Sequence, residues 1–452
     1  MGTPSSRSRP LDSSSDSDEE LLEIHGDIDP DTSIPNHAKI LIISRDQSYL
    51  THGIHKFPAK FFPELPRYLI RRYSERNHQV LDPMCGSGTV VLEAMLSGRN
   101  AVGIDIDPMA RLITKVKTTP IEEFLLESAC EKLMEAIKKK ERARDSEPHI
   151  PDFNYRDTWF RPFVLRELGI ILESICDLDL TDLGVTRTSS HHSDVVDFMQ
   201  VVFSSIIRDA SNADPHCTRT VIRKNLVKKI SAGDTIARFY SALSRQLDGM
   251  KRLHTLYQTS GVGEVRLPDG NAMETGLRTS AIDLAVSSPP YINAVDYPRT
   301  HQLEMYWLGL VEEGPLSNMK RKYIGTETVY KREYERLKIS GVETLDPILE
   351  EIFDQDPRRS FITYKFFEDM KLQFQEMARV LKPGGHYCVA IGNNLIRNVE
   401  VPSHEILSEI ATAEDVGFSL DKVFFSALIR HFIRIPRRER MHGEWILILQ
   451  KQ

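Results

Sequence analysis

The amino-acid sequence predicts an α/β protein with a doubly wound, mostly parallel sheet that is interrupted by a long helical insertion. Three observations lead to this prediction. Short apolar runs of strand type alternate with segments of helical spacing over residues 34–119. The alternation stops over residues 120–260, where amphipathic helical spacing continues without strand-type runs. It resumes over residues 261–452, so two separated parts of the chain are expected to build one sheet.

The first 33 residues are rich in Ser, Asp and Glu and contain few large apolar side chains. Two arginines stand against nine acidic residues, so this segment carries the whole net charge of −7 and the rest of the chain is neutral. Such a composition buries too little apolar surface to offset the conformational entropy lost on ordering. We therefore expect residues 1–33 to form a disordered acidic tail.

The sequence also indicates in which cellular compartment the protein is expected. The polar N-terminus lacks the apolar stretch of a secretory signal, and no apolar run is long enough to span a bilayer. The cysteines lack the spacing of a zinc site or a disulfide framework. We expect a cytoplasmic protein with no membrane contact, no bound metal and reduced thiols at Cys85, Cys130, Cys176, Cys217 and Cys388.

The first α/β part contains a complete strand-turn-helix-strand unit. A strand at Lys39–Ser44 and a helix at Pro63–Tyr73 precede it. Gln79–Asp82 has the pattern of a buried strand and runs into a glycine-rich turn at Pro83–Gly88. The remaining elements of this unit are a helix at Thr89–Ser97, a strand at Ala101–Asp105 and a helix at Pro108–Lys117. This order is typical of the start of a parallel doubly wound sheet.

The second α/β part begins with a strand at Gly263–Leu267 and another at Ile282–Val286. A charged, Tyr-rich stretch at residues 314–358 then interrupts the alternation and is expected to be a lid or recognition segment. The later elements are a helix at Phe361–Val380, a strand at His386–Ile391, a helix at His404–Val416 and a final strand at Trp445–Leu449.

The glycine turn has the features of a cofactor site. Gly86 and Gly88 allow a sharp turn and a close approach of ligand, and Asp105 ends the next strand, where a carboxylate can accept hydrogen bonds from ribose hydroxyls. The third glycine of a dinucleotide fingerprint and the Lys-Ser/Thr pair of a phosphate loop are both missing. Asp82 instead suits a cationic ligand with an amino group. A structural turn without any ligand remains the alternative.

A rigid Ser-Pro-Pro-Tyr turn follows the strand at Ile282–Val286. Consecutive prolines stiffen a loop and donate no backbone hydrogen bonds, so they fix carbonyl groups toward a substrate. An exocyclic amino group on a base is a poor nucleophile, and acceptors that hold its hydrogens increase its reactivity. We expect the Ser288 hydroxyl and the Pro289 carbonyl to be these acceptors, with Pro290 stiffening the turn and Tyr291 stacking on a flipped base.

These residues resemble those of the amino-methyltransferases of nucleic acids, most closely the DNA cytosine-N4 methyltransferases of restriction–modification systems. Three blocks carry the resemblance: Thr51–Pro66, Asp82–Thr89 and Ser288–Tyr291. The resemblance implies a Rossmann-like class I methyltransferase fold, with a seven-stranded, mostly parallel sheet and an antiparallel last strand. It also implies S-adenosylmethionine as the cofactor.

The resemblance assigns roles to individual positions. The first block would line the methionine end of the cofactor, the glycine block would hold its amino and carboxylate groups, Asp105 its ribose, and Asp269 its adenine amino group. The residues expected to bind the cofactor are Phe57, Ala59, Lys60, Phe61, Asp82, Met84, Gly86, Gly88, Thr89, Asp105, Ile106 and Asp269.

Ser at the head of the tetrapeptide is associated with cytosine N4, and Asp or Asn there with adenine N6. Met84 departs from the Phe usual in this family, and a Met-Cys turn also resembles RNA guanine-N2 methyltransferases. Adenine N6, an amino group in RNA, and a silent module that only binds nucleic acid therefore remain alternatives. Cytosine C5 fits poorly, because no Pro-Cys nucleophile is present.

Double-stranded DNA is the expected partner, held by basic residues through its phosphates. We expect the insertion at residues 120–260 to recognise the target sequence, a cognate restriction endonuclease to act on the same sequence, and the protein to be a monomer or dimer. Clusters at residues 138–144, 223–229 and 320–322 are also basic. The residues expected to contact DNA are Arg299, Arg434, Arg437, Arg438 and Arg440.

Overall fold

A nine-stranded sheet forms the centre of the computed structural model, which describes residues 21–44, 46–143, 147–292, 295–311, 316–427 and 443–452. The strand order is β1-β2-β10-β11-β7-β6-β3-β4-β5. The strands are β1 (Leu21–His25), β2 (Lys39–Ile43), β3 (Gln79–Asp82), β4 (Asn100–Gly103), β5 (Val265–Arg266), β6 (Ile282–Ser287), β7 (Leu381–Ile391), β10 (Phe418–Ala427) and β11 (Gly443–Lys451).

Seven of these strands form the expected Rossmann-like sheet. From β7 through β6, β3 and β4 to β5, neighbouring strands are parallel, and β11 is antiparallel to both β7 and β10. The predicted fold class, with an antiparallel last strand, is confirmed. Beyond β10 the sheet continues into β2, the predicted strand at Lys39–Ser44, and into β1, which was not predicted.

Alternating side chains of the central strands pack against helices on the two faces of this sheet. In β7, Cys388 and Ala390 belong to the core shared with α1 (Glu64–Tyr73) and α2 (Thr89–Leu96). Tyr387 and Val389 point the other way. They belong to the core that includes α13 (Pro357–Val380) and α14 (Ser403–Thr412). Both faces are therefore covered, as a parallel sheet requires.

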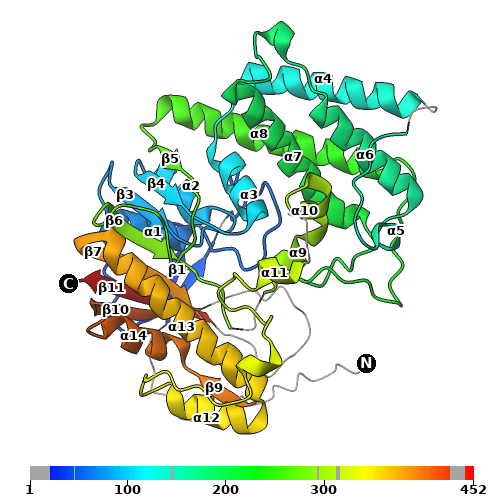
Figure 1. Ribbon diagram of the computed structural model, residues 1–452. Coiled ribbons are helices and arrows are strands. Elements are labelled where there is room, and N and C mark those ends of the chain that lie inside the picture. The colour runs from blue at the N-terminus through cyan, green and yellow to red at the C-terminus, as the bar shows by residue number, and fades with distance from the viewer. Residues whose placement is uncertain (1–20, 45, 144–146, 293–294, 312–315, 428–442) are drawn as a thin grey trace, which may run out of the picture.

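The helical insertion packs beside the sheet and not as a detached lobe (Figure 1). Its core is continuous with α2, α3 (Pro108–Thr118) and α10 (Gln302–Leu308). Trp307 of α10 lies edge-on to Phe160 and Phe203 of the insertion, with ring centroids 5.8 and 5.9 Å away. The helices of the insertion are α4 (Glu123–Arg142), α5 (Arg156–Trp159), α6 (Pro162–Cys176), the 3-10 turn Thr181–Leu183, α7 (Ser190–Ala210) and α8 (Asp234–Thr259).

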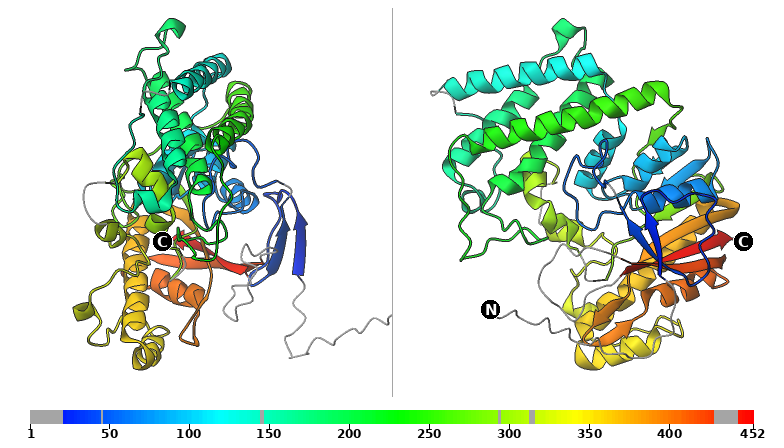
Figure 2. Two further views of the ribbon diagram at one scale, coloured as in Figure 1. Left: turned by 90° about the vertical axis from the view of Figure 1, so that its right-hand side faces the viewer. Right: turned by 180° about the vertical axis from the view of Figure 1, so that it is seen from behind.

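Part of the expected disordered tail is ordered. Strand β1 pairs in parallel with β2, and the two lie at an edge of the sheet (Figure 2). Ile28 and Ile34 are buried, and Asp27 forms an ion pair with Arg67 of α1. The composition of residues 1–33 as a whole concealed these few apolar contacts, so the expectation of disorder was wrong for residues 21–33. Residues 1–20 lie outside the described residues.

Residues 314–358 were expected to form a lid or recognition segment, and the described part of this stretch contains short helices. They are α11 (Leu316–Lys320), the 3-10 turn Lys331–Glu333 and α12 (Asp346–Gln355), and α9 (Tyr297–Thr300) precedes them. A small hairpin of β8 (Asn394–Ile396) and β9 (Val399–Val401) follows β7. Among the described helices, none combines the length and the apolar character needed to cross a membrane.

Candidate active site

The glycine turn joins β3 to α2 at the carboxyl edge of the sheet. Gly86 and Gly88 have φ of 50° and 72°, in the left-handed region that favours glycine. A Cβ at Gly86 would lie 3.1 Å from Cε1 of Phe57, and one at Gly88 would lie 2.7 Å from Cγ2 of Thr114. Gly86 therefore lets Phe57 lie directly on the turn, and Gly88 lets α2 begin close to α3.

Asp82 is a buried carboxylate at the end of β3. Its Oδ1 accepts a hydrogen bond of 2.9 Å from the Ser287 hydroxyl and one of 3.2 Å from the Met84 amide. Burial raises the pKa of Asp82 to about 7, because removal from water disfavours the charged form more than these hydrogen bonds favour it. A cationic group beside Asp82 would lower its pKa again, because it favours the charged carboxylate.

Asp105 lies opposite Asp82, just beyond the end of β4. Its carboxylate accepts hydrogen bonds from the amides of Gly86 at 2.8 Å and Asp107 at 2.9 Å. Burial, and secondarily the negative charge of Asp107, raises the pKa of Asp105 to about 7. Two acidic groups therefore lie close together with no basic side chain hydrogen-bonded to either among the described residues.

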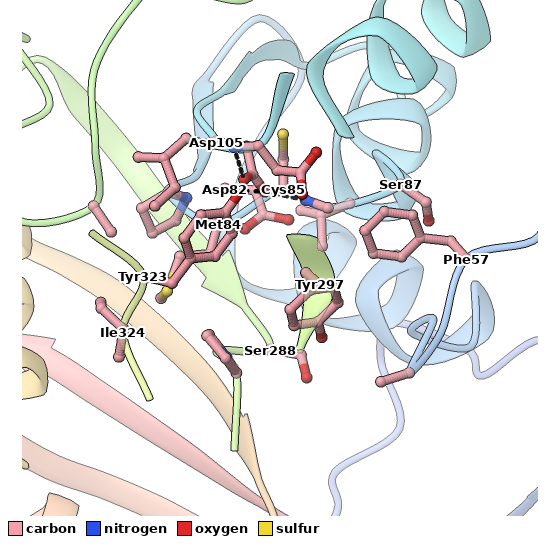
Figure 3. Close-up of a pocket in the computed structure, with 18 of the residues that line it drawn as sticks. Phe57, Asp82, Met84, Cys85, Ser87, Asp105, Ser288, Tyr297, Tyr323 and Ile324 are labelled. Atoms are coloured by element: carbon pink, nitrogen blue, oxygen red, sulfur yellow. Dashed lines mark hydrogen bonds between the residues drawn. The ribbon is translucent and has the colours of Figure 1, made fainter. Parts of the chain in front are cut away.

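These groups line one pocket, shown in Figure 3. The space between its walls is about 880 Å³ when the open mouth is included. Ten of the twelve residues expected to bind a cofactor contribute to its wall: Phe57, Ala59, Lys60, Phe61, Asp82, Met84, Gly86, Thr89, Asp105 and Ile106.

The Ser-Pro-Pro-Tyr turn reaches the same pocket. Ser288 and Pro290 lie in its wall, and Pro289 is buried between them. Tyr291 is not part of the wall. Its hydroxyl donates a hydrogen bond of 2.6 Å to Oε1 of Glu444 on β11. Burial and the nearby Glu444 charge raise the pKa of Tyr291 well above its usual value.

Two tyrosines that were not predicted from the sequence, Tyr297 and Tyr323, complete the wall. Tyr297 of α9 stacks on Phe57 with ring centroids 5.7 Å apart. Tyr323 donates a hydrogen bond of 3.1 Å to Oδ2 of Asp107, although 216 residues separate the two. Tyr297 lies two residues before Arg299, which was expected to contact DNA, and it is Tyr297 that lines the pocket. No local pattern points to Tyr323.

Two expected cofactor residues lie outside the wall. Asp269 is exposed and forms an ion pair of 2.5 Å with Arg111, so its expected position beside the adenine was wrong. The turn after β5 carries Asp269 outward and directs Asn271, Ala272 and Met273 into the pocket instead. Gly88 supports the pocket from behind, as the residue before α2.

Of the five arginines expected to contact DNA, the structure describes only Arg299. Arg299 is exposed and lies outside the pocket wall. Arg434, Arg437, Arg438 and Arg440 lie outside the described residues. In the insertion, Arg223 pairs with Asp214 at 2.6 Å. Lys228 donates to the carbonyls of Arg208, Asp209 and Ser211, so neither Arg223 nor Lys228 is a free cation.

The pocket fits a nucleoside cofactor that carries a positive charge and an amino group. Asp82 and Asp105, whose pKa values are raised, have no cationic partner among the described residues. The glycine turn allows close approach, and Phe57 and Tyr297 offer apolar faces. These features match S-adenosylmethionine, whose sulfonium and amino groups are cationic.

Several known proteins are similar to this chain. A family model described as DNA methylase, covering N6- and N4-specific enzymes, matches residues 13–115. Type II methyltransferase M.MvaI of Kocuria varians is 23% identical over 408 residues, which cover 83% of this chain and 84% of the relative. Type II methyltransferase M.BsoBI of Geobacillus stearothermophilus is 22% identical over 440 residues, which cover 86% and 82%.

A solved methyltransferase structure also aligns with the chain. This SAM-dependent methyltransferase of Methanosarcina mazei aligns over 85% of this chain and 96% of its own, at 12% identity and a TM-score of 0.30. The sequence matches agree with the site, in which a glycine turn and a Ser-Pro-Pro-Tyr turn meet in one pocket. These comparisons and the site support a Type II DNA methyltransferase that uses S-adenosylmethionine, similar to the amino-methyltransferases of restriction–modification systems.

Proposed function

We propose that this protein transfers the methyl group of S-adenosylmethionine to N4 of cytosine in double-stranded DNA. It would act at a specific sequence in the cytoplasm and protect host DNA from a cognate restriction endonuclease. One observation carries the choice of cytosine: Ser288, at the head of the Ser-Pro-Pro-Tyr turn, lines the same pocket as Asp82 and Asp105. In the family that the chain resembles, Ser at this position accompanies cytosine N4.

The cofactor would be held by residues from both edges of the pocket. Asp82 would accept hydrogen bonds from its amino group and Asp105 from its ribose hydroxyls, while Phe57 and Tyr297 would pack on its apolar parts. When bound, S-adenosylmethionine supplies an electrophilic methyl group. Its positive charge favours the ionised forms of both buried carboxylates.

The Ser-Pro-Pro-Tyr turn would hold the reacting nitrogen of the base. The Ser288 hydroxyl and the Pro289 carbonyl would each accept a hydrogen bond from the amino group, which directs the nitrogen lone pair toward the methyl group. Pro290 limits the motion of the turn. The target base has to leave the double helix to reach this depth.

Tyr291 lies outside the wall of the cofactor pocket, so it would stack on the flipped base only where the base extends beyond that wall. Its hydroxyl is held by Glu444, a residue of the last strand, so the ring is fixed from the far side of the turn. A ring fixed in this way loses little further conformational freedom when a base stacks on it. The helical insertion would read the target sequence, and the arginines near the C-terminus would contact phosphates.

The experiment that tests the function incubates the purified protein with deuterium-labelled S-adenosylmethionine and either unmethylated DNA or RNA. The nucleic acid is then digested to nucleosides and analysed by mass spectrometry. We expect labelled N4-methylcytosine from DNA only. Labelled N6-methyladenine would replace cytosine with adenine as the target, since the matched family includes both specificities. Label in RNA alone, or in neither, would refute the proposal.

A further inference from the structure

A second pocket adjoins the cofactor pocket and shares part of its wall. Tyr297, Tyr323 and Ile324 line both cavities, one on each side. The rest of its wall includes Arg219, which belongs to the helical insertion, and residues 325–328. A single layer of side chains therefore separates the pocket that contains Arg219 from the cofactor pocket.

In the part of the chain that the structure describes, each charged side chain in the wall of the second pocket forms an ion pair, except Arg219. Lys320 forms an ion pair of 2.6 Å with Asp296, and Glu327 forms one of 2.9 Å with Arg359. Arg219 is exposed, and no carboxylate lies within ion-pair distance of it among the described residues. The pocket thus has one arginine available for an anion.

The backbone on both sides of Arg219 is fixed, although its side chain is exposed. Arg208 donates a hydrogen bond of 3.1 Å to the carbonyl of Thr218. The hydroxyl of Thr220, which is buried, donates one of 2.8 Å to the carbonyl of Thr300 in α9. The loop is thereby tied to the helix that carries Tyr297. A ligand that binds Arg219 would not have to order the loop, which lowers the entropic cost of binding.

We propose that this second pocket binds the phosphodiester of the nucleotide whose base enters the cofactor pocket, with Arg219 as the phosphate-binding residue. This inference rests on the proposed function, because a base held at Ser288 has its own sugar and phosphate attached nearby. A guanidinium matches the geometry of phosphate oxygens with two parallel hydrogen bonds. Arg219 would thus position the substrate by stabilising the flipped nucleotide.

The test requires a DNA duplex with the target sequence, located by mapping the bases that the wild-type protein methylates. One version pairs the target base normally, and a second places an abasic site opposite it, which lowers the cost of flipping. The variants are Arg219→Ala, Arg219→Lys and, as a matched control, Lys224→Ala. Lys224 is an exposed cation of the same loop that lies outside the second pocket.

If Arg219 stabilises the flipped nucleotide, Arg219→Ala lowers kcat at saturating DNA by about tenfold on the paired duplex, the loss expected for one charge-assisted hydrogen bond. On the duplex with the abasic site the loss shrinks to about twofold, because flipping then needs little help. Arg219→Lys recovers part of the activity. Lys224→Ala changes kcat by the same factor on both duplexes, and every variant binds S-adenosylmethionine as the wild type does.

Three results would overturn this proposal. An equal loss of kcat on both duplexes, or a change in KM alone, would make Arg219 a general DNA contact. Weaker binding of S-adenosylmethionine by Arg219→Ala would make its role structural. A wild-type protein that methylates no DNA would instead refute the proposed function, so the two failures are distinguishable.

Discussion

Asp82 and Asp105 show how the pocket is prepared for a cation. Both carboxylates have a pKa raised to about 7 by burial, above the usual value of 3.8. The folded protein therefore binds more protons than the unfolded chain between about pH 4 and 7. In this range the contribution of the two groups to the free energy of unfolding falls as pH rises. Neighbouring positive charge would favour their ionised forms and offset this loss.

The affinity for S-adenosylmethionine should therefore rise with pH. Asp82 must lose its proton before it can receive the cationic amino group, so from pH 6 to pH 8 we expect the Kd to fall by about tenfold for this one group. Asp82→Asn should weaken binding and flatten the pH profile. Titration calorimetry at pH 6, 7 and 8 measures both effects.

Asp269→Asn provides the control for this titration. Asp269 is an acid that the sequence had placed beside the adenine, but the structure places it in an exposed ion pair with Arg111. Such a pair contributes little to stability. Asp269→Asn should leave both the Kd and its pH dependence unchanged, and a Kd raised as much as by Asp82→Asn would restore the original assignment.

Ser288 and Tyr291 allow the two proposed roles of the tetrapeptide to be separated. Ser288→Ala removes an acceptor for the amino hydrogens, so kcat should fall by about 10- to 100-fold while the Kd for S-adenosylmethionine changes by less than about twofold. Tyr291→Phe keeps the ring and removes only the hydrogen bond to Glu444, so its loss of kcat should be smaller. Steady-state kinetics on DNA and direct cofactor binding measure the two quantities. Equal changes in kcat and Kd for Ser288→Ala would place this residue in the cofactor site.

At the scale of elements, the sequence predicts local units well and long-range contacts poorly. The β3-turn-α2-β4 unit and β6 appear within a few residues of their expected bounds, because apolar periodicity and glycine placement specify them locally. Tyr323 contacts Asp107 because the tertiary fold brings a segment that is distant in sequence to the pocket. The residues next to Tyr323 in the sequence do not predict that contact. Strand β1 was missed for a different reason, since its few apolar residues lie in a segment whose overall composition is acidic and polar.

Gly88 illustrates why the glycine turn requires its residues. It precedes α2 with a positive φ, and a Cβ there would press on Thr114 of α3. Gly88→Ala should lower the free energy of unfolding by about 2–4 kcal/mol, which combines the cost of a left-handed alanine with overpacking. Gly184 has a similar φ of 76°, but no atom lies within 4 Å of the position that a Cβ would take there, so Gly184→Ala isolates the backbone cost of about 1 kcal/mol. Urea unfolding of both variants tests this, and equal losses would exclude the contact with Thr114 as a cause.

At the scale of the whole molecule, the insertion and the sheet share one continuous apolar core. Leu92 of α2 and Ile113 of α3 pack in the same cluster as Phe203 of α7 and Trp307 of α10. An insertion attached only by its two chain connections would move independently of the sheet. A shared core instead fixes its position, which a residue of the insertion needs if it is to act beside the cofactor pocket.

This shared core predicts cooperative unfolding, and the three tryptophans of the chain can report it. Trp307 lies in the core of the insertion, and Trp445 lies on β11 of the sheet. In variants that retain only one of these two, with the other tryptophans replaced by Phe, urea unfolding followed by fluorescence should give coincident midpoints. Saturating S-adenosylmethionine should raise both midpoints equally, because it binds only the folded pocket. A lower midpoint for Trp307, or a cofactor-induced shift seen only by Trp445, would mean that the insertion unfolds separately and that its core does not hold it against the sheet.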